Sequence, residues 1–210
     1  MYSQNEERAN WITHGLAVLL SLMGSGFMCF ALMKYNHSVG VWLCVGVYLI
    51  SLLALYTAST LYHFVKEEKW KHIFRVADHS AIYSKIAGTY TPFLVLAIPN
   101  QLGYELLMAL WLLAGVGVLF KIFFVRKLNF LSTLIYLGMG WMALGVIVPL
   151  FKALQPIIFW LIIAGGIFFT VGVIFYLLRN MRYSHAIWHG FVMVGSACHF
   201  SGIYLFLSTS

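Results

Sequence analysis

Long hydrophobic runs separated by short polar connections dominate the sequence. Their interiors carry almost no charge, whereas the strands of a membrane barrel would alternate in short segments. Seven runs are long enough to cross roughly 30 Å of hydrocarbon as helices, and they cover residues 11–33, 39–64, 77–98, 103–125, 130–150, 156–178 and 185–207. The pattern predicts an all-α integral membrane protein, a seven-transmembrane-helix bundle that forms a single domain over residues 1–210.

The composition agrees with a membrane protein. Of the 210 residues, 62% are hydrophobic and only 9% are charged, and a soluble domain of this size could not cover that much apolar surface. The cysteines, Cys29, Cys44 and Cys198, all fall inside predicted spans and show no CxxC spacing. We therefore interpret them as packing residues and expect no disulfide framework.

Lysine and arginine residues gather on one side of the predicted bundle. Only Lys34 and Lys152 fall on the side opposite the N-terminus. The N-terminal side carries ten: Arg8, Lys66, Lys69, Lys71, Arg75, Lys121, Arg126, Lys127, Arg179 and Arg182. Because cytoplasmic loops are enriched in these residues, we predict a cytoplasmic N-terminus and an external C-terminus. The net charge of +7 could attract anionic lipid headgroups, but it gives no support for a nucleic-acid partner.

The last hydrophobic run opens with a pair of histidines. His185 and His189 are four residues apart, so on a helix they lie on one face, one turn from each other. Two imidazoles at this spacing can bind one transition metal. The competing interpretation is a pair of interfacial histidines hydrogen-bonded to water or headgroups. Ionisable groups inside a membrane favour a functional role by default.

Two further segments place polar residues at the same depth. His63, Asp78 and His185 each lie three residues from a lysine or arginine on the N-terminal side of the bundle. At ~1.5 Å per residue, all three would lie about one helical turn below the same membrane face. Three histidines with one position left for water form an open zinc site of the catalytic kind. We therefore predict a zinc site near the cytoplasmic face.

Asp78 and Ser59 are the candidate catalytic residues beside these histidines. Asp78 would hold or deprotonate a water at the open position. Ser59 is four residues before His63 and shares its helical face, where it could hydrogen-bond the water or a developing oxyanion. The competing interpretations are an Asp78 carboxylate stabilised by the helix dipole and a Ser59 hydroxyl bonded to its own helix.

Other polar residues inside the runs have different predicted roles. We interpret His14 as a hydrogen-bonded packing histidine. His199 is ten residues beyond His189, roughly 15 Å along the axis, and is therefore too far away for the same metal site. Lys85 lies seven residues after Asp78, on nearly the same face. It is either bonded to carbonyls or tyrosines within the bundle, or a substrate-binding cation that faces a cavity and meets a lipid carboxylate or carbonyl.

The arrangement resembles the hemolysin III family. That family is the bacterial branch of the progestin and adipoQ receptor (adiponectin receptor-like) group, which is related to alkaline ceramidases. The resemblance is carried by Ser59-x3-His63, Asp78, His185-Ala186-Ile187-Trp188-His189-Gly190, Glu6-Glu7-x-Ala9-Asn10-x2-Thr13-His14 and Gly88-Thr89-Tyr90-Thr91-Pro92-Phe93.

The resemblance implies a seven-helix fold with a cytoplasmic N-terminus in a bacterial inner membrane. It also implies zinc held by His63, His185 and His189, with Asp78 contacting it through water.

Three hypotheses about function follow. In the first, the protein is a zinc-dependent intramembrane hydrolase that acts on a lipid amide or ester, with membrane lipids or a fatty-acid ligand as partners. In the second, it is a pore-forming cytolysin in which zinc only joins the helices. In the third, it is a lipid sensor without turnover. The sequence favours the hydrolase, because apart from Asp78, Lys85 and the histidines the runs offer little to line a pore.

Overall fold

The computed structural model describes residues 3–125, 127, 129–178 and 180–209, and within these ranges the chain is helical with short connections. The elements in chain order are α1 (Gln4–Lys34), α2 (Val39–Phe64), α3 (Glu68–Ala97), α4 (Gln101–Phe124), α5 (Asn129–Trp141), the 3-10 helix η1 (Met142–Val146), α6 (Ile147–Ala153), α7 (Pro156–Leu177) and α8 (Ser184–Thr209). This confirms the all-α prediction for the described residues. Arg126 and Arg179, which enter the charge count, lie outside them.

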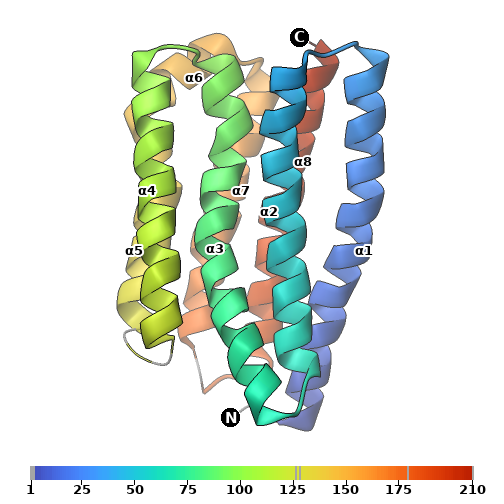
Figure 1. Ribbon diagram of the computed structural model, residues 1–210, viewed down its shortest axis with the longest axis vertical. Helices are drawn as coiled ribbons and strands as arrows, with labels where there is room; N and C mark the ends of the chain where they lie inside the picture. Colours follow the sequence, from blue (N-terminus) through green and yellow to red (C-terminus); the bar gives the residue numbers. More distant parts are fainter. Residues whose placement is uncertain (1–2, 126, 128, 179, 210) are drawn as a thin grey trace.

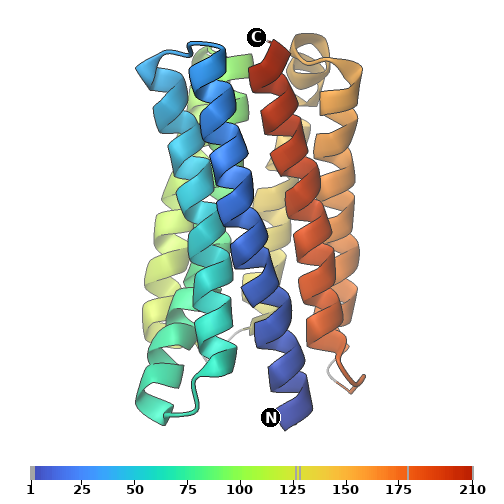
Figure 2. The same cartoon turned by 90° about the vertical axis from the view of Figure 1, so that its right-hand side faces the viewer.

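The long helices lie side by side along one axis, with the N-terminus at one end and the C-terminus at the other (Figures 1 and 2). α1 packs against α2 and α8, α3 packs between α2 and α4, and α7 packs against α8. The α2–α3, α4–α5 and α7–α8 connections lie at the end that holds the N-terminus (Figure 1). Of the basic residues in these connections, the described ones, Lys66, Lys127 and Arg182, therefore lie at one end of the bundle.

The surface and the interior suit a membrane-embedded bundle. Large apolar side chains such as Val39 (75% exposed) and Phe123 (73% exposed) face outward, whereas Lys85, Lys121 and several histidines are buried. Six segments have the length and hydropathy to cross a membrane: Gln4–Lys34, Val39–Phe64, Gln101–Phe124, Phe130–Ala153, Pro156–Leu177 and Ser184–Thr209. α3 is not among them, because charged or polar residues occur along most of its length.

Two helices begin well before the hydrophobic runs that predicted them. α1 begins at Gln4 instead of residue 11, and Ser3 and Glu6 form a capping box at its start. The Ser3 hydroxyl accepts from the Glu6 backbone N–H, and the Glu6 carboxylate accepts from the Ser3 backbone N–H. Such a cap satisfies backbone donors without any hydrophobic burial. A prediction based on hydrophobic runs therefore misses these turns, as it also misses the start of α3 at Glu68.

The predicted span 130–150 is interrupted in its second half. α5 ends at Trp141, and η1 connects it to α6. Pro149 lies two residues into α6; it has no N–H to bond the Gly145 carbonyl, and its ring would clash with that carbonyl in a regular helix. The Tyr90 hydroxyl lies at the break, where it accepts from the Ala143 N–H and donates to the Gly140 carbonyl. The hydroxyl thus supplies hydrogen bonds that the helix lacks at this point.

Candidate metal centre

Three buried histidines from two helices meet at the N-terminal end of the bundle. His63 lies in the last turn of α2, and His185 and His189 lie in the first two turns of α8. One nitrogen of each ring lies within 4.8 Å of the other two, and the Nε2 atoms of His63 and His185 are 3.2 Å apart. Two nitrogens bound at ~2.0–2.1 Å on tetrahedral corners would be about 3.3 Å apart. The three side chains could therefore hold a metal ion.

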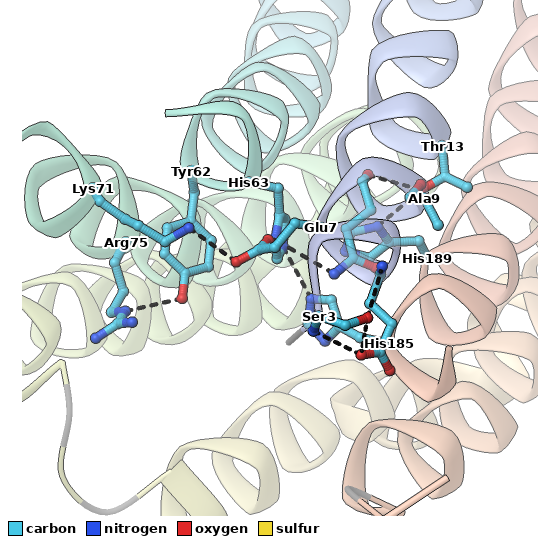
Figure 3. A network of polar contacts seen from close by, with 12 residues as sticks. Ser3, Glu7, Ala9, Thr13, Tyr62, His63, Lys71, Arg75, His185 and His189 are labelled. Carbon is cyan, nitrogen blue, oxygen red and sulfur yellow. Dashed lines mark hydrogen bonds and ion pairs between the residues drawn. The ribbon is translucent and has the colours of Figure 1, made fainter. Parts of the chain in front are cut away.

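The contact between Glu7 and His63 fixes the proton of that imidazole. His63 Nδ1 lies 2.6 Å from Glu7 Oε2, and Lys71 donates to the other carboxylate oxygen at 2.9 Å (Figure 3). Because an ionised carboxylate only accepts hydrogen bonds, Nδ1 must carry the proton. In the neutral ring the lone pair of His63 is then on Nε2, the atom that lies 3.2 Å from His185 Nε2. A carboxylate behind a histidine in this way orients metal-binding imidazoles and makes them more basic.

Thr13 fixes the position of the proton on the His189 imidazole. Its hydroxyl lies 2.9 Å from the Ala9 carbonyl and 2.8 Å from the Asn10 carbonyl, so its hydrogen points to the backbone of α1. The hydroxyl oxygen therefore accepts from His189 Nδ1, at 3.1 Å. His189 Nε2 is left with its lone pair, and it is buried without a hydrogen-bond partner among the described residues. A buried nitrogen of this kind suits a metal ion.

Asp78 and Ser59 lie beside this cluster. Asp78 is buried in the first half of α3 and interacts electrostatically with His63. It is not part of the group of mutually close ligand atoms. Ser59 is fully buried next to Asp78, but its hydroxyl makes no hydrogen bond of standard geometry within the described ranges. The five predicted metal-binding and catalytic residues therefore lie close together, but only the three histidines have ligand atoms within reach of one metal ion.

His14 is closer to the cluster than the sequence predicted. Its ring stacks on His189 with centroids 3.4 Å apart, and it meets the edge of Tyr56. It is buried as a packing residue, but neither ring nitrogen has a hydrogen-bond partner in the part of the chain that the structure describes. The expected hydrogen bond is therefore not found there. The signal for its position was the spacing of Glu7, Asn10 and His14, which places all three on one face of α1.

The first turns of α1 also fix the start of α8. Glu6 Oε1 accepts from the Tyr183 backbone N–H at 3.1 Å, two residues before His185. Tyr183 has a positive φ of 58°, a conformation that few residues adopt without support. Together with Glu7 and Thr13, this contact makes α1 the support of the histidine cluster. Nothing in the hydrophobic pattern or the histidine spacing had indicated a role for Glu6, Glu7 or Thr13.

A largely apolar cavity of about 170 Å³ extends from this site into the bundle between α3, α5, α7 and α8. Asp78, His14 and Trp188 line it near the histidine cluster, and Lys85 and His199 line it farther along. A cavity needs roughly 10–15 Å³ by this measure for each water molecule. The space is therefore large enough for part of an acyl chain.

Replacing Glu7 with glutamine is expected to weaken zinc binding about 10- to 100-fold, because the imidazole of His63 loses its charged partner. Competition with a fluorescent zinc chelator measures the affinity. Glu67→Gln is the matched control, since it removes an exposed carboxylate at the same end of the bundle. Equal affinities for Glu7→Gln and wild type would contradict the role of Glu7.

Comparison with known proteins identifies the family. The family model described as "Haemolysin-III related" matches residues 2–200. The Hemolysin-3 homolog of Bacillus subtilis is 44% identical over 200 residues, which are 95% of this chain and 93% of the relative. Hemolysin-3 of Bacillus cereus is 44% identical over 195 residues, covering 93% and 89%. The human Monocyte to macrophage differentiation factor is 27% identical over 215 residues, covering 98% and 86%. The chain therefore belongs to the haemolysin-III related family.

Proposed function

We propose that this protein is a zinc-dependent hydrolase of a lipid amide or ester. The observation that carries the proposal is the position of the histidine cluster. Three buried imidazoles, each with one ring nitrogen within 4.8 Å of the other two, lie next to a buried carboxyl group and at the end of an apolar cavity. A purely structural metal site would need a fourth protein ligand. None completes the group among the residues that the structure describes.

The chemistry divides between the metal and the side chains. Zinc held by three histidines supplies a Lewis acid that polarises a carbonyl group and makes a water molecule far more acidic. Asp78 takes a proton from the attacking water and returns it to the leaving amine or alcohol. Ser59 donates its hydroxyl hydrogen to the oxygen of the carbonyl as negative charge develops there. The water oxygen becomes part of the released fatty acid, and the carbon–nitrogen or carbon–oxygen bond breaks.

The cavity would hold the acyl chain of the substrate. Its lining is mainly apolar and comes from α3, α5 and α7, so it excludes bulk water from the chain. Asp78 lines the cavity, so in this proposal the scissile carbonyl would lie at the end close to the histidines. Binding energy gained along the chain would then help to orient the carbonyl for attack.

We place the protein in the inner membrane of a bacterium, with α3 as a seventh span and the site at the cytoplasmic side. The basic residues in the connections at the end of the bundle that holds the N-terminus support this orientation. α3 runs alongside the other long helices (Figure 1), and its polar residues Asp78 and Lys85 are buried in the bundle. The Bacillus relatives support a bacterial membrane.

A second candidate function is cytolysis, which the name Hemolysin-3 of the Bacillus cereus relative favours. In that case, zinc would join α2 to α8 and the protein would form a pore. A pore needs a polar path across the membrane, whereas the cavity between the helices has mainly apolar walls. We therefore keep the hydrolase as the main proposal.

The test is an assay of fatty-acid release by the purified zinc-loaded protein from a panel of N-acyl amides and acyl esters. Wild type is expected to hydrolyse at least one class, and His185→Ala is expected to reduce the rate at least about 100-fold. His72→Ala serves as control, because His72 is exposed and lies outside the cluster. Lysis of erythrocytes by wild type, without fatty-acid release from any member of the panel, would instead favour the cytolysin.

A further inference from the structure

The far part of the cavity contains a buried lysine. Lys85 is only 4% exposed, and its Nζ donates to Thr89 Oγ1 at 2.6 Å. The rings of Tyr48 and Phe169 face the ammonium group at 5.3 and 5.8 Å. Lys85 lines the same cavity as Asp78, and seven residues of α3, about 10 Å, separate the two.

The Lys85 ammonium group has more hydrogen-bond donors than Thr89 accepts. Thr89 Oγ1 gives its own hydrogen to the Lys85 carbonyl at 2.8 Å, so it can only accept from Nζ. An ammonium group has three donors, and Thr89 takes one of them. The salt bridges of the described residues involve Glu7 with His63 and Lys71, and none involves Lys85. A cation inside a membrane protein without an acidic partner indicates a ligand.

His199 offers a hydrogen-bond acceptor in the same cavity. Its Nε2 lies 3.1 Å from the Ile162 carbonyl, which can only accept, so Nε2 carries the hydrogen. The neutral ring then presents a lone pair at Nδ1, and this atom is buried with no hydrogen-bond partner among the described residues. His199 lines the cavity, packs on Phe169 and lies close enough to Lys85 to interact electrostatically.

A hydroxyl group complements both side chains. Its oxygen accepts from the Lys85 ammonium, and its hydrogen is donated to His199 Nδ1. A carboxylate would accept from Lys85, but it has no hydrogen to donate to His199 Nδ1. Its negative charge would also lie close to the lone pair of that nitrogen. A plain hydrocarbon chain would leave both polar groups unpaired, which is unfavourable in an apolar cavity.

We propose that Lys85 and His199 form a subsite for a hydroxyl group in the middle of the acyl chain, so that the preferred ligand is a hydroxylated fatty acyl lipid. The proposal rests on the proposed function only for its direction, in which the carbonyl lies at the histidine cluster. The separation of about 10 Å along α3 places the hydroxyl well away from the carbonyl. The subsite would therefore recognise where the hydroxyl lies on the chain.

The test is binding of three probes to the purified full-length protein in detergent micelles, by competition against a fluorescent fatty acid. The probes are stearic acid, stearic acid with a hydroxyl on the tenth carbon, and stearic acid with a hydroxyl on the second carbon. Wild type is expected to prefer the tenth-carbon compound over the other two by about tenfold, the effect of one hydrogen bond to a charged group. Lys85→Met is expected to remove this preference.

Lys121→Met is the matched control, because Lys121 is also a buried lysine but does not line the cavity. His199→Phe provides a second variant if Lys85→Met does not fold, and it is expected to reduce the preference. Equal binding of the three probes by wild type would mean that water alone fills the subsite and would overturn the proposal. Retention of the preference in Lys85→Met would overturn it as well.

The outcome separates this proposal from the hydrolase itself. Binding of the probes is measured without turnover, so a preference for the tenth-carbon compound is detected whether or not the protein hydrolyses lipids. Hydrolysis without any such preference would leave the proposed function standing and remove the subsite. A preference without hydrolysis would support the subsite and remove the proposed function.

Discussion

Replacing Asp78 with asparagine is expected to lower the rate of hydrolysis by about 10²–10⁴-fold while the protein keeps its zinc. An amide has nearly the shape of the carboxylate, but it cannot take a proton from water. Asp78 is not one of the three residues whose ligand atoms lie close together, so the metal is expected to stay. Single-turnover rates on the best substrate, measured beside elemental analysis of the same sample, test both statements.

Glu105→Gln is the control for this variant, since Glu105 is an exposed carboxylate at the opposite end of the bundle. Its rate is expected to equal that of wild type. If Asp78→Asn hydrolyses at the wild-type rate, Asp78 is not the base. If Asp78→Asn loses zinc as fully as a histidine variant does, Asp78 is a direct ligand, and the division of roles in the site is different.

The second large effect is expected for His189→Ala, which removes the most deeply buried member of the cluster. Bound zinc is expected to fall from one per chain to almost none. A ligand that binds only the folded state stabilises it, by about 4 kcal/mol at 1,000 times its dissociation constant. Zinc is therefore expected to raise the Tm of wild type and to leave that of His189→Ala unchanged.

His72→Ala provides the comparison, because it removes an exposed histidine outside the cluster. It is expected to bind zinc and to respond in Tm like wild type. Full zinc content in His189→Ala would show that the metal binds elsewhere. A rise in Tm of His189→Ala with zinc, equal to that of wild type, would lead to the same conclusion.

The hydrophobic pattern was sufficient for the helices but not for their ends. The capping box of Ser3 and Glu6 extends α1 into a polar segment, and such a cap leaves no hydrophobic signal. The break after Trp141 depends on Pro149 and on a hydroxyl from α3. The proline is visible in the sequence, whereas the contact of Tyr90 with Ala143 joins residues 53 positions apart.

The sequence predicted the level of the site residues along the bundle axis. His63 and His185 each lie three residues from a basic residue at the end of a hydrophobic run, which was enough to place them at one level of the bundle. Depth does not give the rotation of a helix about its axis. The contacts of Glu7 with His63 and of Thr13 with His189 span 56 and 176 positions, so they became apparent only in the folded bundle.

The measurement that tests the central claim most directly is zinc K-edge X-ray absorption on the purified wild-type protein, combined with its metal content. We predict one zinc per chain, with only nitrogen and oxygen neighbours at ~2.0–2.1 Å and the scattering pattern of three imidazoles. A well-folded protein that takes up no zinc when it is supplied would contradict the claim. Sulfur neighbours at ~2.3 Å would also contradict it, because they would place the metal at a cysteine and away from His63, His185 and His189.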